Sequence, residues 1–298
     1  MNNNNNNNNN YYKNKKNSNF VLGTINNVNN RSPINININK KLDYSEKDLN
    51  LKKFIVNHHN EINKANKKYK LMEEKQIIKK SLILYACHTN NKIKFNSFDS
   101  NIKYLKMIPN SELVVINSTN LKSSMFLKNK YQHVCNKYFL IENDKLLDFG
   151  KWLYALNNIK LESYDFIVFI NDSIIIEKPI NFFFSLFSTK NIDYYGYNNS
   201  TQTTYHSQSY LFSIKTNEVY IFIEFIEKNN NNITSDKESV VFNLELKLQN
   251  QYSNSKNFLN LRKFPEHLGK NIFFNNDYLY FTLKNAGLFP FSKVKRLI

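Results

Sequence analysis

Residues 164–179, "YDFIVFINDSIIIEKP", form the most strand-like segment of the sequence. The run "DFIVFI" ends in Asn171, Asp172 and Ser173, and three isoleucines follow. Aromatic and β-branched residues without polar alternation predict a strand that is buried on both faces of a sheet. A carboxylate directly after such a strand is a candidate ligand-binding group. The simpler interpretation is a polar turn in which Asp172 accepts hydrogen bonds from local backbone N–H groups.

Four further apolar runs flank this segment, and segments of helical character such as "IKYLKMI" and "KWLYALNNI" separate the first four strands. Strands that alternate with helices at this spacing predict βαβ units and a mainly parallel sheet covered by helices. Further helices are predicted at about 216–228, 236–250 and 276–286. The four additional strand runs are "LILYAC" (82–87), "ELVVIN" (112–117), "KYFLIE" (137–142) and "SYLFSIK" (209–215).

The N-terminal part of the chain differs in composition from the rest. Asparagine supplies 19 of the first 40 residues. Such a segment cannot bury enough apolar surface to fold, so residues 1–40 are predicted to be a disordered Asn-rich tail. Residues 41–80 are predicted to hold a basic amphipathic helix at about 45–78, which begins with the capping-box pattern "SEKD". This helix either contacts a membrane surface or a partner, or lies on the domain predicted at 81–298.

Most of the net charge of +17 lies near the N-terminus, because residues 1–80 contribute +10 of it. A basic tail and helix of this kind is usually a solvated surface, so nucleic-acid binding is not expected. No uncharged apolar run approaches the roughly 18 residues of a membrane-spanning helix, and no signal peptide is recognised. We expect a cytoplasmic protein, with peripheral contact to a membrane left open.

Several common catalytic signatures are absent from the sequence. Its five glycines form neither GxGxxG nor GxxxxGK[ST], and HExxH and GxSxG do not occur. Cys87 and Cys135 form no CxxC pair, so neither a zinc site nor a disulfide framework is predicted. Dinucleotide oxidoreductases, P-loop NTPases, zinc proteases and α/β-hydrolases therefore lack support. The chemistry must come from side chains at the ends of strands.

Two more polar clusters accompany predicted strands. "ENDKLLDFGKW" follows the third strand and contains Asn143, Asp148 and the single tryptophan, Trp152. Its alternative interpretation is an N-cap at Asp148 and a core position for Trp152. "YHSQSYLFS" places His206 and Gln208 at the start of another strand. A lone histidine in this setting is more often structural than catalytic.

The order of these segments resembles the rhamnan synthesis protein F family, a group of GT-A-like glycosyltransferases. The match extends over residues 81–298 and implies a GT-A-like α/β fold, a Rossmann-type sandwich of nucleotide-diphospho-sugar transferases with a mainly parallel sheet. The matching elements are Asn143 with "DFGKW" (148–152), "FINDS" (169–173), "HSQSY" (206–210), "LELKLQ" (244–249) and "FPFSK" (289–293).

The resemblance also implies roles for individual residues. Asp172 would lie where GT-A enzymes carry their metal- and diphosphate-binding acidic motif. Glu245 would be the general base that deprotonates the acceptor hydroxyl, with Glu238 as a neighbouring alternative. The non-functional interpretation of Glu245 is a position on a solvated helix face. The residues expected on the donor side are Asn143, Asp148, Lys151, Trp152, Asn171, Ser173, His206, Gln208 and Lys293.

Together these assignments predict a glycosyltransferase of polysaccharide biosynthesis that moves a hexose or deoxyhexose from a nucleotide-diphosphate donor to a glycan or another hydroxyl acceptor. A divalent cation, Mn²⁺ or Mg²⁺, is the expected cofactor at Asp172, although "NDS" supplies one carboxylate where many GT-A enzymes have D-x-D. Two alternatives stay open. One is a non-catalytic carbohydrate- or nucleotide-binding module on the same fold. The other is a nucleic-acid or anionic-membrane binder that acts through residues 40–80.

Overall fold

The computed structural model describes residues 46–75, 79–89, 92–118, 126, 128–142, 144–234, 236–264, 271–275 and 277–294. The predicted tail at 1–40 and Ser45 of the capping-box pattern lie outside these residues. Residues 45–298 form one compact unit, so the helix that precedes residue 81 belongs to the same unit as the sheet.

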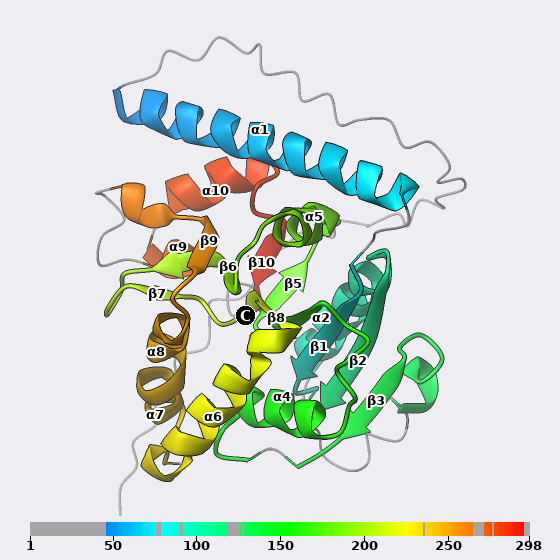
Figure 1. Ribbon diagram of the computed structural model, residues 1–298. Coiled ribbons are helices and arrows are strands. Elements are labelled where there is room, and N and C mark those ends of the chain that lie inside the picture. Colours follow the sequence, from blue (N-terminus) through cyan, green and yellow to red (C-terminus); the bar gives the residue numbers. More distant parts are fainter. Residues whose placement is uncertain are drawn as a thin grey trace, which may run out of the picture. The chain divides into compact units, whose positions relative to one another are not determined.

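The central sheet contains eight strands within the described part of the chain. They are β1 (Ser81–Cys87), β2 (Ser111–Asn117), β3 (Lys137–Leu140), β4 (Phe166–Asn171), β6 (Tyr194–Ser200), β7 (His206–Ser207), β8 (Leu211–Lys215) and β9 (Ser255–Leu259). Their order is β3-β2-β1-β4-β8-β6-β7, with β9 also paired to β6 (Figure 1). The pairs β3-β2, β2-β1, β1-β4 and β6-β9 are parallel, and β8, β6 and β7 join in antiparallel orientation. This arrangement confirms the predicted α/β sandwich with a mainly parallel sheet.

Strand β1 explains why the strand runs are apolar without alternation. All of its residues are buried, and successive side chains enter two different hydrophobic cores. Leu82 and Leu84 face the core that helices α4 (Asp148–Asn157) and α6 (Val219–Asn229) cover. Ile83 and Tyr85 face the core that α2 (Lys92–Leu105) and α5 (Asn181–Thr189) cover. A strand between two helical layers has no solvent-facing side, which favours apolar residues at every position.

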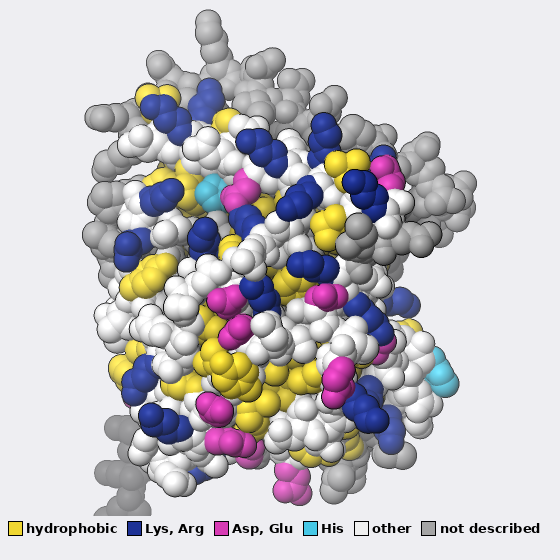
Figure 2. Space-filling model, viewed as in Figure 1, with side chains coloured by type: hydrophobic (Ala, Val, Ile, Leu, Met, Phe, Trp, Pro, Cys, Tyr) yellow, Lys and Arg dark blue, Asp and Glu magenta, His cyan; other side chains and the backbone are white. Residues whose placement is uncertain are grey.

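Helix α1 (Glu46–Glu74) lies along the α5 side of the unit (Figure 1). The ring nitrogens of His58 lie 2.8 Å from the carbonyl oxygens of Phe54 and Phe258, and Lys68 donates to the Thr189 carbonyl at 3.0 Å. Lys and Arg side chains gather over α1 on the face that Figure 2 shows. The predicted helix at 45–78 is thus confirmed over 46–74. It lies on the domain, which was one of the two interpretations of the sequence.

The isoleucines after Ser173 leave the central sheet. They form β5 (Ile174–Ile176), which pairs antiparallel with β10 (Phe291–Lys293) in a separate two-stranded sheet. Asn101 of α2 stabilises this ribbon from inside the protein, because its side chain donates to the Ile174 carbonyl at 2.9 Å and accepts from the Ile176 N–H at 2.7 Å. The sequence did not indicate this ribbon, since its two strands are 115 residues apart in the register Ile176 to Phe291.

The predicted C-terminal helices are present with one interruption. The helices predicted at 216–228 and 276–286 correspond to α6 and to α10 (Asp277–Asn285), which follows the short α9 (Ile272–Asn275). The segment predicted at 236–250 contains α7 (Lys237–Val240), a π-helical turn (Val241–Glu245) and α8 (Leu246–Leu248). None of the helices in the described ranges combines the length and the apolarity that crossing a membrane requires.

Strand β6, "YYGYNNS", was not predicted because Gly and Asn are depleted in strands. Gly196 is required there by a close approach of two neighbouring strands. A Cβ atom at this position would lie 1.9 Å from the Ser207 hydroxyl oxygen and 2.2 Å from Oδ1 of Asn257. Only a residue without a side chain lets β7 and β9 approach β6 on this side.

Buried tyrosines make the fold sensitive to alkaline pH. Burial raises the pKa of Tyr85 and Tyr197 well above the ordinary value. Above about pH 10 the unfolded chain releases phenolic protons that the folded protein retains, so the free energy of unfolding should fall as pH rises. We expect a limiting slope of about 1.4 kcal/mol per pH unit for each such tyrosine.

Urea unfolding between pH 8 and pH 11 measures this slope. Tyr85→Phe should make the decline shallower, because it removes one of the phenols with a raised pKa. The variant should fold, because the Asn101 amide that donates to the Tyr85 hydroxyl keeps the Ile174 carbonyl as a partner. An identical decline in the variant and the unaltered protein would contradict the assignment.

Candidate functional site

Strands β1 and β4 mark the point where the strand order of the sheet reverses. From β1 the chain proceeds outward through β2 to β3, and then returns to place β4 on the other side of β1. Ligands of open α/β sheets bind in the crevice outside the carboxyl ends of the strands at such a point. The register places Ala86 opposite Asn171. The residues just beyond them, His88 and Asp172, therefore meet at the carboxyl ends of these two strands.

Asp172 is bound on both oxygens of its carboxylate. Oδ1 accepts a hydrogen bond from the Lys94 ammonium at 2.7 Å, and Oδ2 accepts one from the backbone N–H of His88 at 2.8 Å. The Asp172 carbonyl accepts a further bond from Lys94 at 3.2 Å. Only 7% of the Asp172 side chain is exposed, against 23% for Lys94. Removing either member would leave the other charge largely buried and uncompensated, which is strongly destabilising.

The turn after β4 is closed by Asn171 and not by Asp172. Oδ1 of Asn171 accepts from the backbone N–H of Ser173 at 3.1 Å and from its hydroxyl at 2.6 Å, as in an Asx turn. Lys293 of β10 donates to the Ser173 hydroxyl oxygen at 3.3 Å, and the Val294 N–H donates to the Ser173 carbonyl at 3.2 Å. A polar turn is therefore present, but Asp172 does not close it. The Asp172 carboxylate binds Lys94 of α2 and the backbone N–H of His88 after β1.

Further polar side chains lie at the carboxyl ends of β1 and β2. Nδ1 of His88 lies 2.9 Å from the Ser118 hydroxyl oxygen. The Asn117 amide donates to the hydroxyl oxygens of Thr89 at 2.9 Å and of Tyr138 at 2.8 Å. The carboxyl ends of three adjacent parallel strands thus present a connected polar layer above the apolar sheet.

Sequence reasoning missed these residues, although a signal was present for some of them. His88 and Ser118 directly follow the predicted strands "LILYAC" and "ELVVIN", so the strand-end rule that selected Asp172 applies to them equally. Lys94 carried no such signal. Its contact with Asp172 depends on how α2 packs against β5, and that packing is a tertiary feature.

The segment "HSQSY" lies beside the turn after β4. The backbone N–H of Asn171 donates to the Tyr210 carbonyl at 3.2 Å, and the Lys293 ammonium lies 5.8 Å from the centre of the Tyr210 ring. The Glu245 carboxylate accepts from the backbone N–H of Ser209 at 3.4 Å. Four of the sequence elements that the family resemblance groups together are therefore neighbours in space.

Glu245 ends a π-helical turn and is partly exposed, whereas Glu238 lies on the exposed first turn of α7. π-Helical turns occur frequently at functional sites, because the extra residue re-aims side chains. Glu245 is therefore the better candidate of the two for a base beside "HSQSY".

His206 and Gln208 are buried and have protein partners. Nδ1 of His206 lies 2.8 Å from the Thr204 carbonyl oxygen, and Oε1 of Gln208 accepts from the Asn271 amide at 3.4 Å. Only 5% of His206 and 6% of Gln208 are exposed. In this arrangement both residues offer little surface to a ligand.

The predicted donor-side residues of α4 divide into two groups. Asp148 is part-exposed and accepts from Lys151 at 3.2 Å, but only 3% of the Lys151 side chain is exposed. Trp152 is fully buried, and its indole N–H donates to the Leu84 carbonyl at 3.2 Å. Trp152 is thus a core residue, which corrects its assignment to the donor side. The positive charge of Lys151 is paired with the carboxylate of Asp148. Asn143 lies outside the described residues.

The loop before α4 carries a strained residue. Leu147, not Asp148, is the N-cap, and it has a φ angle of 54°, which is costly for a side chain with a Cβ atom. The Asp144 carboxylate accepts from the Leu146 N–H at 2.9 Å. It lies so close to Gly150 that a Cβ atom there would be 2.3 Å from Oδ1 of Asp144. Asp144 is therefore a further acidic group at this loop. Its carboxylate can occupy this position because Gly150 has no side chain.

The electrostatic surroundings of Cys87 show how the charged groups gather at the end of β1. Burial raises the pKa of the Cys87 thiol well above its ordinary value, and the negative charge of Asp172 adds to this effect. Lys151, Asp148 and Lys94 contribute smaller influences on the same thiol. Charged groups of α2, of α4 and of the turn after β4 therefore all influence the thiol at the carboxyl end of β1.

The donor set around Asp172 does not fit a divalent cation as it stands. Both carboxylate oxygens accept from protein donors, and the amide oxygen of Asn171 is engaged by Ser173. In the described ranges no three His, Cys, Asp or Glu side chains gather where they could hold a metal ion. Mn²⁺ and Mg²⁺ sites are built from several oxygen ligands, and here an ammonium group takes the place next to the carboxylate.

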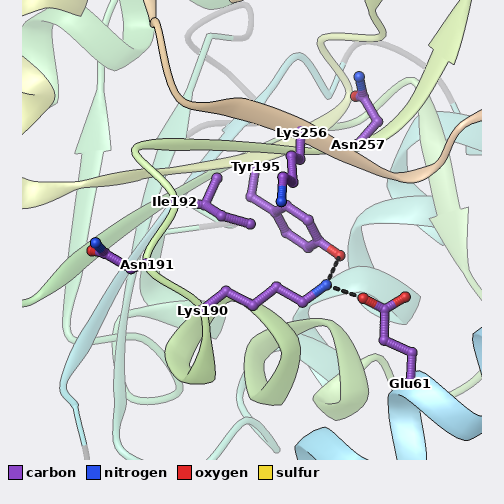
Figure 3. A pocket seen from close by; sticks show the side chains of 7 residues that line it. All are labelled: Glu61, Lys190, Asn191, Ile192, Tyr195, Lys256 and Asn257. Atoms are coloured by element: carbon purple, nitrogen blue, oxygen red, sulfur yellow. Dashed lines mark hydrogen bonds and ion pairs between the residues drawn. The ribbon is translucent and has the colours of Figure 1, made fainter.

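A polar cavity of about 360 Å³ lies elsewhere, between α1, α5, β6 and β9 (Figure 3). Lys190 lines this cavity, and its ammonium group forms an ion pair with Glu61 and donates a hydrogen bond to the Tyr195 hydroxyl at 3.3 Å. Tyr195 is at the start of β6, opposite Ser213, which in turn is opposite Val168 in β4. This cavity is thus set apart from the carboxyl end of β4, and we do not assign the chemistry to it.

Comparison with known proteins gives limited likeness. No protein-family model matches the chain. Two curated relatives, both named virulence protein VirA and both from Vibrio anguillarum, one of them from strain ATCC 68554 / 775, are each 29% identical over 184 residues. The match covers 60% of this chain and 57% of each relative, so the chain spans little more than half the length of the curated relatives it matches.

Two solved structures show partial likeness to the fold. One is 4-diphosphocytidyl-2C-methyl-D-erythritol synthase from Anaerococcus prevotii DSM 20548, with a TM-score of 0.42, 7% identity and coverage of 60% of this chain and 87% of that one. The other is the apo form of the glycosyltransferase GlyE in Streptococcus pneumoniae TIGR4, with a TM-score of 0.42, 14% identity and coverage of 71% and 51%.

The core position of Trp152 can be tested with its own fluorescence, because it is the chain's single tryptophan. We expect acrylamide to quench the folded protein weakly, since the indole is fully buried. Trp152→Ala should lower the free energy of unfolding by about 3–5 kcal/mol through lost contacts with Phe169 and Phe212. A quenching slope equal to that of the urea-unfolded chain would contradict this placement.

Proposed function

We propose that the protein is a glycosyltransferase that moves a sugar from a nucleotide-diphosphate donor to a glycan or another hydroxyl acceptor. The observation that carries the proposal is the position of Asp172 at the strand-order reversal, with Lys94 and Lys293 bound at the same turn. The order of motifs that resembles the rhamnan synthesis protein F family supports it further, and makes a rhamnose-type deoxyhexose the first donor to test.

The proposed reaction needs a base and a stabilised leaving group. Glu245 would accept the proton of the acceptor hydroxyl, whose oxygen forms a bond to the anomeric carbon of the donor sugar. The bond from that carbon to the phosphate oxygen breaks, and its electron pair leaves with the nucleoside diphosphate. The positive charges beside the Asp172 turn would stabilise this diphosphate.

A non-catalytic binding module on the same fold is the second candidate. The observation that favours it is the single carboxylate of the "NDS" turn, whose oxygens both have protein partners. This candidate predicts that nucleotide diphosphates bind while no sugar transfer occurs with any donor. The assays below separate the two functions.

Glu245→Gln tests the general base. We expect kcat for transfer of a radiolabelled sugar to fall by about 10²- to 10⁴-fold, because the amide cannot accept the proton. Glu238→Gln is the matched control, since it makes the same change seven residues away on the exposed turn of α7. It should leave kcat within about twofold of the unaltered protein. Equal losses in both variants would refute the assignment of the base.

Asp172→Asn tests the acidic residue at the strand end. We expect transfer to fall by about 10²-fold or more, because the substitution removes the charge that holds Lys94. Asp165→Asn is the control at the opposite end of β4, where Asp165 accepts from the Lys80 backbone N–H at 2.9 Å. It should preserve transfer, and urea unfolding checks that both variants fold. Full activity of a folded Asp172→Asn protein would contradict the proposal.

A further inference from the structure

The turn after β4 has an internal source of positive charge. Lys94 reaches it from the first turn of α2 and binds both the carboxylate and the carbonyl of Asp172, at 2.7 Å and 3.2 Å. Lys293 reaches the next residue from β10 and binds the Ser173 hydroxyl at 3.3 Å. Two ammonium groups from distant parts of the chain thus flank two consecutive residues at the carboxyl end of β4.

We propose that Lys94 and Lys293 bind the diphosphate of the donor and that this binding requires no divalent cation. The inference rests on the proposed function and names the groups that recognise its leaving group. A lysine ammonium binds phosphate oxygens as a compact point charge with several N–H donors. The Lys94 side chain thus supplies beside Asp172 the positive charge that a metal ion would otherwise bring.

The two ammonium groups at this turn agree with an anionic ligand. In the described part of the chain, Lys94 binds the Asp172 carboxylate and Lys293 binds the neutral Ser173 hydroxyl. Asp172 is then a positioning residue, because it orients Lys94. The Lys94 side chain is partly exposed, whereas Asp172 itself is almost fully covered.

The unaltered protein gives the first test, since it needs no substitution. Calorimetric titration with UDP, GDP, dTDP and CDP is carried out once in EDTA and once with Mn²⁺. We expect at least one nucleotide to bind with a Kd that differs by less than about twofold between the two conditions. A Kd that is measurable only with Mn²⁺ would overturn the inference and leave the proposed function standing.

Lys94→Met gives the second test, because methionine keeps the unbranched apolar stem and removes the charge. In EDTA we expect its Kd for the same nucleotide to rise about tenfold or more, from the loss of a charge-assisted contact. Lys103→Met on the exposed last turn of the same helix is the control and should bind like the unaltered protein. Unchanged binding by Lys94→Met would overturn the role of Lys94.

Lys94→Met leaves the Asp172 carboxylate without its cation, so a second variant guards against misfolding. Lys94→Met with Asp172→Asn removes both charges of the pair, and it should fold and still bind the nucleotide about tenfold more weakly in EDTA. Wild-type affinity of this folded double variant would also overturn the inference. Absence of binding by the unaltered protein in both EDTA and Mn²⁺ would refute the proposed function, and the inference with it.

Discussion

The pairing of β1 on both sides, combined with its burial on both faces, is the constraint on which the rest of the structure depends. Its backbone is hydrogen-bonded to β2 and β4, and its apolar side chains enter one of two cores. A polar side chain that is buried along such a strand costs free energy unless it has a hydrogen-bond partner. Polar residues are therefore displaced to its carboxyl end, where His88 meets Asp172 and Ser118.

The ion pair between Lys94 and Asp172 connects this constraint to the chemistry. It ties the first turn of α2 to the end of β4, and Asn101 from the same helix holds β5 just beyond the turn. A buried ion pair contributes little net stability compared with apolar packing, because desolvation of both charges opposes their attraction. Its position at the strand-order reversal agrees with the role that we propose for Lys94 in binding a diphosphate.

Much of the fold was predictable because parallel strands between helical layers leave a strong apolar signature. The five predicted strand runs all contain observed strands, and α1, α6 and α10 lie within about four residues of their predicted ends. The β5–β10 ribbon and β6 were not predictable, since one depends on pairing across the chain and the other is rich in Gly and Asn. Trp152 shows the limit for side chains: a tryptophan near a motif can serve the core alone.

The sequence by itself determined the α/β class and the strand-end position of Asp172. These features follow from apolar periodicity and from local order along the chain. The tertiary structure alone decided that Lys94 binds Asp172, that Asn171 closes the turn, and that Lys151 and Trp152 are withdrawn from the crevice. The reason is physical: hydrogen bonds and ion pairs between distant elements depend on packing geometry, which no local pattern of residues encodes.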